Sequence, residues 1–323
     1  MPEAPFRLAA GAAAVLLLLV AATPLLAPYD PAEQLDPVAG RLRPPGTVLA
    51  AIQLDDGRWW LAERVEWTPE GLRVERLGRV EHLPGAKVRN RSPDGVADRR
   101  VFLLGSDRFS RDVLSRLLHG ARVSLAMGLL AVLLATTLGI AVGAAAATGG
   151  PWLDAVLMRA VDALLAFPWL FLLLAVSSLF RPGPALLVLI LGGTAWMDIS
   201  RLVRGEVLGL RGREFVLAAR GIGQRPAVIL RRHLLPGALP PVLVRGALLV
   251  GQVILVESAL SFLGIGIQPP TPSWGNMVAE GRDVLTTAWW LSAFPGAAIA
   301  ATVIGLNVLG DRLRDALDPR SLT

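Results

Sequence analysis

The sequence predicts an all-α integral membrane protein with six transmembrane helices and a small extracytoplasmic β-rich insertion between helices 1 and 2. The mean hydropathy of +0.54 over 323 residues is too high for a soluble protein with a polar surface. Three long stretches carry no charged residue, at 123–153, 163–180 and 284–310. A helix needs about 20 apolar residues to cross about 30 Å of hydrocarbon, and several stretches reach that length.

Five of the six helices follow from hydropathy and length. The stretch at 184–205 carries Asp198 near one end, and the stretch at 237–265 contains Arg245 and Glu257, so its prediction rests on its flanks and length. The helices are expected at about 121–148, 153–180, 184–205, 237–265 and 286–310.

The first helix is expected within residues 1–27. The run at 8–27 is preceded by Arg7 and ends in the small residue Ala27, which is also typical of a cleaved signal peptide. Because the run is long enough to span a bilayer, a retained helix is favoured over cleavage.

Residues 28–104 form the predicted extracytoplasmic loop, and residues 105–323 the membrane domain. Within 46–100, the strand-like runs TVLAAIQL, RWWLAERVEW and LRVERL are separated by the turn signals DDG and TPEG. We expect a small β-meander. Three strands alone are only marginally stable, so we expect it to pack on the membrane domain or on a partner protein.

The orientation of the chain in the membrane follows from the positions of its arginines. The segment 201–233 contains eight arginines but only Glu206 and Glu214 as acidic residues. Positive residues near helix ends remain cytoplasmic, so the loop 206–236 and both termini are expected in the cytoplasm of a bacterial or archaeal cell. Long loops escape this rule, and 28–104 then lies outside.

Several function classes are excluded by missing motifs. The single lysine, Lys87, is not part of a GxxxxGK[ST] phosphate loop. There is no GxSxG, HExxH or suggestive pair of carboxylates, so we expect a non-enzymatic protein. With no cysteine and three scattered histidines, no metal site is expected. The basic residues follow membrane topology and show no nucleic-acid-binding pattern.

The arginine-rich segment 214–237, EFVLAARGIGQRPAVILRRHLLPG, predicts a helix, a glycine turn and a second helix. Phe215, Ala218, Ala219 and Ile222 form one apolar stripe at helical spacing. Gly223 can adopt a backbone conformation denied to other residues, and Pro226 suits the first turn of a helix. Pro236 is expected to end the second helix. An interfacial connector and a docking site for another protein are both compatible with this pattern.

The segment resembles the EAA loop of permease subunits of bacterial ABC importers, through Ala218, Ala219, Gly223, Leu235 and Pro236. In that family the loop docks on the ATPase subunit. The resemblance implies the same role for Glu214, Ala218, Ala219, Arg220, Gly223, Leu235 and Pro236. Leu217 replaces the glutamate of the family pattern, and Glu214 lies one turn earlier. The sequence RHLLPGALPP is similar to dipeptide, oligopeptide and nickel permeases.

Other segments extend the resemblance in the same order. GSDRFSRDVLSRLLHGARVSL at 105–125 looks like the family's GTDxxGRDVLSR segment, with Ser110 where glycine is usual. Further matches are DAVLMRAVDALLAFP at 154–168, RLVRGEVL at 201–208, ESALSFLGIGIQPPTPSWGNMVAEGRD at 257–283 and LGDRLRDALDP at 309–318.

The resemblance implies a type I ABC importer permease fold and a subunit forming half of the path for peptides or a related small solute. It implies as partners a second, different permease, two ATPases that bind ATP and Mg²⁺, and an extracytoplasmic solute-binding protein. No cofactor is expected in this chain. The alternative is an ion-coupled secondary transporter acting without an ATPase, for which Glu257 and Arg245 are the candidate intramembrane charges.

Other candidate residues have a functional and a structural interpretation. Glu257 lines the translocation path or is a structural carboxylate, and Ser273, Trp274 and Gly275 form an outer gate unless Trp274 only anchors the chain at the membrane interface. Asp107, Arg111 and Asp112 contact the solute-binding protein or form local salt bridges. Asp198 and Arg201, three residues apart, are predicted to pair at a helix end, with a substrate site as the less favoured alternative.

Overall fold

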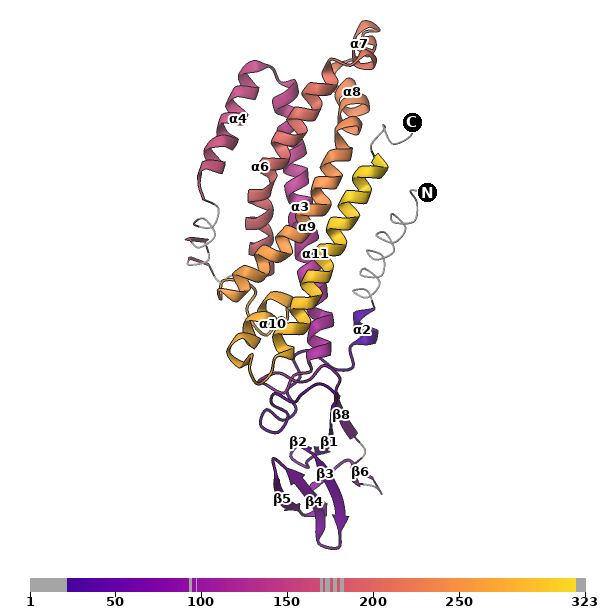
Figure 1. Ribbon diagram of the computed structural model, residues 1–323, viewed down its shortest axis with the longest axis vertical. Helices are drawn as coiled ribbons and strands as arrows, with labels where there is room; N and C mark the ends of the chain where they lie inside the picture. The colour runs from indigo at the N-terminus through magenta and orange to yellow at the C-terminus, as the bar shows by residue number, and fades with distance from the viewer. Residues whose placement is uncertain are drawn as a thin grey trace. The chain divides into compact units, whose positions relative to one another are not determined.

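The computed structural model describes residues 22–92, 95–96, 98–168, 171, 175–176, 179–180 and 183–317 (Figure 1). Within them, one compact unit comprises 123–268 and 299–317, and a second comprises 22–122 and 269–298. The predicted N-terminal helix lies almost entirely outside the described residues. Only the short helix α2, Thr23–Leu26, falls near its end.

Four helical runs among the described residues are long and apolar enough to cross a membrane. Helix α4, Pro151–Ala166, is shorter, and α7, Glu214–Gly221, is a short helix between two of the four runs. The four runs are α3 (Val113–Thr148), α6 (Pro184–Arg211), the continuous run of α8 (Pro226–Ile229) with α9 (Leu235–Phe262), and α11 (Trp290–Leu317).

The predicted helix at 153–180 is not continuous. Helix α4 ends at Ala166, and Phe167 is extended with φ −82° and ψ 123°. Pro168 is the physical reason, because a residue that precedes proline is disfavoured in the helical region. Most of the predicted range beyond this break lies outside the described residues.

Small residues let the helices of the first unit pack closely. A Cβ added to Gly143 of α3 would lie 2.4 Å from the carbonyl oxygen of Ser200 in α6. One added to Gly192 of α6 would lie 2.7 Å from the carbonyl oxygen of Ala131 in α3. Small residues at helix crossings are the usual means of association inside a bilayer, where hydrophobic burial gives no preference for helix contact over lipid contact. Helix α9 also packs against α6.

Pro236 does not end a helix, contrary to the prediction. It lies in the first turn of α9, and a π-helical turn at Leu230–Leu234 joins α8 to α9. Proline lacks an N–H, and its ring disturbs the preceding turn of an α-helix. The wider π turn just before Pro236 accommodates this defect, so the helical run continues.

The second unit contains the strands of the insertion. Sheet order is β2-β1-β8 in one sheet and β3-β4-β5 in another, and all pairs are antiparallel. The predicted strand RWWLAERVEW is two strands that belong to different sheets and break at Glu63. The strands are β1 (Thr47–Gln53), β2 (Trp59–Ala62), β3 (Arg64–Thr68), β4 (Gly71–Arg76), β5 (Arg79–Leu83), β6 (Arg91–Ser92), β7 (Gly95–Val96) and β8 (Asp98–Phe102).

The later part of β1 is buried on both faces, which explains how so small a unit supports two sheets. Leu49 and Ala51 pack into one cluster with Leu61 and Phe102. The alternate residues Ile52 and Leu54 pack into a second cluster, whose other buried members are Ala62, Leu72, Val74, Leu83 and Val88. Successive strand residues point to opposite faces, so β1 contributes to both cores.

A buried carboxylate ties the two sheets together. Asp36 accepts hydrogen bonds from the backbone N–H of Leu61 in β2 and from Arg76 at the end of β4. Burial alone would raise the pKa of Asp36. The hydrogen bonds from Leu61, Ala39 and Arg76 outweigh burial and hold the pKa of this carboxyl below its ordinary value.

Candidate functional site

The segment predicted to be a coupling loop forms a helix and a glycine turn at one end of α6 and α9 (Figure 1). Glu214 lies in the first turn of α7, where a carboxylate stabilises the helix N-terminus. Gly223 has φ +79°, and its N–H donates to the carbonyl oxygen of Arg220 at 2.9 Å. A Cβ at Gly223 would contact nothing within 4 Å, so the glycine is required for its backbone conformation and not for space.

The apolar stripe on α7 differs from the predicted one. Ala219 is 5% exposed and, with Val216, faces the interior. Phe215, Ala218 and Ile222 remain exposed on the other side, and Ile222 is 77% exposed. We call these three residues the α7 face. The predicted small-residue pair is therefore divided, because only Ala218 is presented outward.

Two contacts fasten α7 to the π turn. The ring of Phe215 lies 6.4 Å from that of His233, measured between centroids. His233 Nε2 is 3.1 Å from Oε1 of Gln224, next to the glycine turn. Sequence reasoning missed both Gln224 and His233, although their position on either side of Pro226 is compatible with a fold-back.

The remaining predicted coupling residues occupy different environments. Arg220 is exposed at the end of α7, where a positive charge suits the helix C-terminus. Leu235 is half-buried and Pro236 is exposed, both at the start of α9. The structure therefore gathers the predicted residues along one continuous stretch, with Arg220 and Pro236 open to solvent or to a partner.

The predicted pair of Asp198 and Arg201 does not form. Arg201 reaches Asp162 of α4, with 2.5 Å between Nη2 and Oδ1. Asp198 instead faces Arg245 of α9, with 3.9 Å between Oδ2 and Nη2. A spacing of three residues places two side chains on one helix face, but neighbouring helices offered each a different partner.

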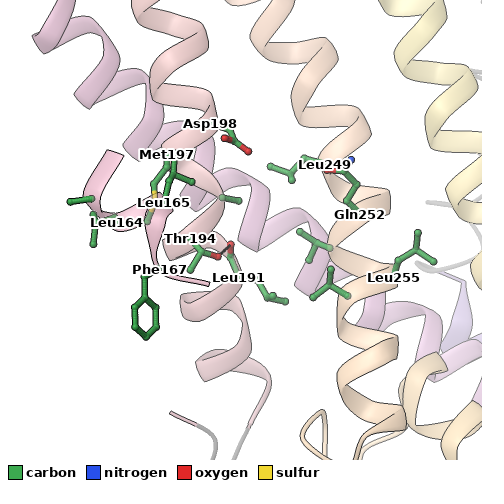
Figure 2. Close-up of a pocket in the computed structure, with 14 residues that line it drawn as sticks. Leu164, Leu165, Phe167, Leu191, Thr194, Met197, Asp198, Leu249, Gln252 and Leu255 are labelled. Atoms are coloured by element: carbon green, nitrogen blue, oxygen red, sulfur yellow. Dashed lines mark hydrogen bonds between the residues drawn. The ribbon is translucent and has the colours of Figure 1, made fainter. Parts of the chain in front are cut away.

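A cavity of about 850 Å³ lies against α4, α6 and α9 (Figure 2). Its lining is mostly apolar, and Thr194, Asp198 and Gln252 are its polar side chains. Figure 2 shows Asp198 on α6 and Gln252 on α9, on facing walls. Glu257, for which the sequence left a place in the translocation path and a structural role open, is 1% exposed and accepts a hydrogen bond from Ser261 Oγ at 2.8 Å.

Asp107, Arg111 and Asp112 are almost completely buried, at 1%, 3% and 0% exposure. The carboxylate of Asp107 accepts hydrogen bonds from the N–H of Phe109 and Arg111 and pairs with the guanidinium groups of Arg111 and Arg116. The geometry favours local salt bridging, because these side chains present no surface to a solute-binding protein.

Further hydrogen bonds and one long-range ion pair hold the same region. Arg116, at the start of α3, also pairs with Glu280 at 2.6 Å, and Glu280 belongs to α10 (Trp274–Gly281). Asp112 accepts hydrogen bonds from the N–H and hydroxyl of Ser115, both at 2.7 Å. Burial is the larger effect and raises the pKa of the Asp112 carboxyl.

The predicted gate residues begin α10. Ser273 caps this helix in a capping box with Asn276. Trp274 is 3% exposed and donates a hydrogen bond from Nε1 to the carbonyl oxygen of Leu117 at 3.0 Å. Gly275 is buried as well. An anchor at the membrane interface would be exposed, so that interpretation of Trp274 is wrong.

Residues 135–322 match the family described as binding-protein-dependent transport system inner membrane component. The chain belongs to this family. It is 41% identical over 243 residues to a Brucella suis protein described as a candidate peptide transport system permease, covering 72% of this chain and 81% of the relative. It is 39% identical over 216 residues to the dipeptide transport system permease protein DppC of Alkalihalophilus pseudofirmus, covering 67% and 71%.

The fold agrees with this assignment. A chain of the inward-facing MetNI methionine ABC transporter superposes with a TM-score of 0.53 at 20% identity, covering 63% of this chain and 96% of that chain. The likeness concerns the fold alone. The protein is thus a multi-pass inner membrane permease component of a binding-protein-dependent ABC importer, with the type I permease fold. The alternative of a secondary transporter acting without an ATPase is set aside.

Proposed function

We propose that this permease carries peptides and that the α7 face docks on an ATPase subunit. The peptide assignment is supported by the names of the relatives in Brucella suis and Alkalihalophilus pseudofirmus. The observation that carries the docking assignment is an exposed apolar face on a short helix, held by Gly223 at the end of the membrane helices. An exposed apolar patch with a polar surround is typical of a protein interaction surface.

The proposed assembly has a second, different permease that encloses the path together with this chain. Two ATPases bind ATP and Mg²⁺ on the cytoplasmic side, and a solute-binding protein delivers peptide from outside. Both termini lie in the cytoplasm, since the arginines of 201–233 mark that side. In this assembly the chain itself catalyses no covalent step.

The coupling mechanism follows from the contacts of α7. Closure of the ATPases displaces α7, and the contacts of Phe215 and Gln224 with His233 pass the displacement to the π turn at the start of α9. Helix α9 contributes one wall of the 850 Å³ cavity. Nucleotide binding and peptide binding therefore bias one two-state equilibrium from opposite ends.

The test replaces Ala218 with arginine. The variant is co-expressed with the second permease, the ATPases and the binding protein from the same genome, so that the full importer can assemble. A buried charge at an apolar interface costs several kcal/mol, so A218R should lose the ATPases on purification in mild detergent. The matched control is A86R, which makes the same change at an exposed alanine of the insertion. Intact-complex mass spectrometry reports the subunits retained.

Loss of the ATPases in A218R but not in A86R supports the docking assignment. Equal retention of the ATPases in both variants contradicts it. Wild-type complex in proteoliposomes should take up peptide only with ATP, and uptake driven by an ion gradient alone would contradict the proposed function as a whole.

A further inference from the structure

Asp198, Arg245 and Gln252 form a polar cluster between α6 and α9, inside an otherwise apolar set of helices. Nη1 of Arg245 is 3.3 Å from Oε1 of Gln252, and Nη2 of Arg245 is 3.9 Å from the Asp198 carboxylate. Thr194 lies one turn before Asp198 on α6, and both line the cavity. The side chains of Asp198 and Arg245 are 59% and 34% exposed.

The charges of this cluster are loosely paired compared with their neighbours. Arg204 binds Asp154 through two nitrogens at 2.5 and 2.6 Å, and Arg201 binds Asp162 at 2.5 Å. At 3.9 Å, Asp198 and Arg245 are beyond hydrogen-bond distance. The Asp198 carboxylate accepts no hydrogen bond from any residue that the structure describes, so it retains its capacity for another donor.

The cost of these charges favours a cavity that holds water, although most of its lining is apolar. A charged side chain at the centre of a membrane helix costs about 2.5–3.5 kcal/mol on insertion scales. Such residues face a bundle interior or an aqueous cavity and mark solute pathways. A cavity covered by lipid would leave Asp198 and Arg245 half-exposed to hydrocarbon, which this cost disfavours.

We propose that the cluster is a subsite for the two charged termini of a short peptide. The inference rests on the proposed function and names the residues that recognise the solute. The Asp198 carboxylate accepts hydrogen bonds from the peptide ammonium group, and the Arg245 guanidinium donates to the peptide carboxylate. Charge-assisted hydrogen bonds of this kind are about twice as strong as neutral ones. Gln252 orients the guanidinium through its side-chain oxygen.

The rest of the cavity suits variable side chains. Leu164, Leu191 and Leu249 provide apolar walls without further charge. Cavities of about 300–1,000 Å³ take ligands of small-molecule size, so a volume of 850 Å³ accommodates a dipeptide or tripeptide. The subsite therefore recognises the charged termini that all short peptides share and tolerates differences among their side chains.

The first experiment uses the absence of cysteine in this chain. Leu255 lines the cavity and is 47% exposed, so L255C places a single thiol there. The full importer in nanodiscs is treated with a cationic methanethiosulfonate, and modification of this chain is followed by mass spectrometry. Alanylalanine at about ten times its Kd should slow labelling about tenfold. N-acetyl-alanylalanine amide, which lacks both charges, should not.

Variants identify the residues responsible. D198N and R245Q, each combined with L255C, should abolish protection by alanylalanine. The matched control D162N removes the carboxylate of a neighbouring ion pair, between Asp162 and Arg201, that lies outside the polar cluster, and it should keep protection. An unreactive thiol at position 255, equal protection by the blocked peptide, or protection that survives both D198N and R245Q would overturn the proposal.

Measuring peptide uptake tests the subsite and the proposed function separately. If wild-type proteoliposomes take up alanylalanine with ATP, D198N and R245Q should reduce uptake about tenfold or more, while ATPase retention is unchanged. Normal uptake by both variants contradicts the subsite and leaves the proposed function intact. Protection at position 255 without ATP-dependent uptake by the wild type supports the subsite and contradicts the proposed function.

Discussion

Replacing Ser110 with glycine should stabilise this permease. Ser110 has φ +64°, in the left-handed region, and its side chain is fully buried. Its hydroxyl has no hydrogen-bond partner among the described residues. Ser110 also has little space around it. Gly40 packs so close to it that a Cβ added to Gly40 would lie 1.9 Å from the Ser110 hydroxyl oxygen. The resembling permeases usually carry glycine at this position.

The expected gain is about 2 kcal/mol. A left-handed conformation costs an L-residue about 1–2 kcal/mol, and a buried hydroxyl without a partner costs about 1–3 kcal/mol. Against this, glycine loses more backbone entropy on folding, about 0.5–1 kcal/mol, and the buried methylene contributes about 0.8 kcal/mol that is lost. Relief of the left-handed strain outweighs the loss of backbone entropy, and removal of the unpaired hydroxyl outweighs the loss of the buried methylene.

The assay is thermal unfolding of the purified complex in detergent, followed by tryptophan fluorescence. S110A is the control, because it removes the hydroxyl but keeps a Cβ in the left-handed region. We expect S110G to unfold at the highest temperature, S110A at an intermediate one and the wild type at the lowest. An S110G variant that unfolds at or below the wild-type temperature would refute the reasoning.

Three further predictions concern other parts of the molecule. G223A should reduce peptide-dependent ATP hydrolysis by about 5–30-fold, because an alanine in the left-handed conformation costs about 1–2 kcal/mol. G221A is the control and should be neutral, because a Cβ at Gly221 also has no atom within 4 Å and the φ of Gly221 is not positive. R116M should lower the thermal stability of the second unit by about 3–5 kcal/mol, because it removes one of the two guanidinium groups that pair with the buried Asp107 and with Glu280. A wild-type melting curve would contradict this. Asp36 has a lowered pKa in the folded state, so its contribution is present above the unfolded pKa of about 3.9 and is lost as pH falls through the folded pKa. D36N should remove this part of the acid sensitivity, as measured by melting between neutral and acidic pH.

Local patterns predicted the backbone of residues 214–226 well. The helix start at Glu214, the turn at Gly223 and the helix start at Pro226 depend on backbone preferences of individual residues, which act over a few positions. The long membrane helices were predictable for the same reason, since hydropathy and length are properties of a single segment.

Pairing between segments could not be predicted. The alternation in RWWLAERVEW fits one strand, and only the partners of β2 and β3 reveal that Glu63 separates two sheets. Likewise, nothing near Asp198 in the sequence indicates that Arg245, on another helix, is its partner. For Trp274 the sequence left both an outer gate and an interface anchor open, because its burial against Leu117 depends on a contact across more than 150 residues.

The helical run from Pro226 to Phe262 is unevenly stiff. The π turn at 230–234, Pro236 in the next turn, and Pro240 and Pro241 inside α9 all lie within its first part. Each of these features removes or lengthens backbone hydrogen bonds, and kinks in helices concentrate at such positions. The part of α9 that follows, with Arg245 and Gln252, has no such defect. Elastic deformation is therefore expected to concentrate between 230 and 241, so that a force on α7 tilts the later part of α9 as a rigid rod.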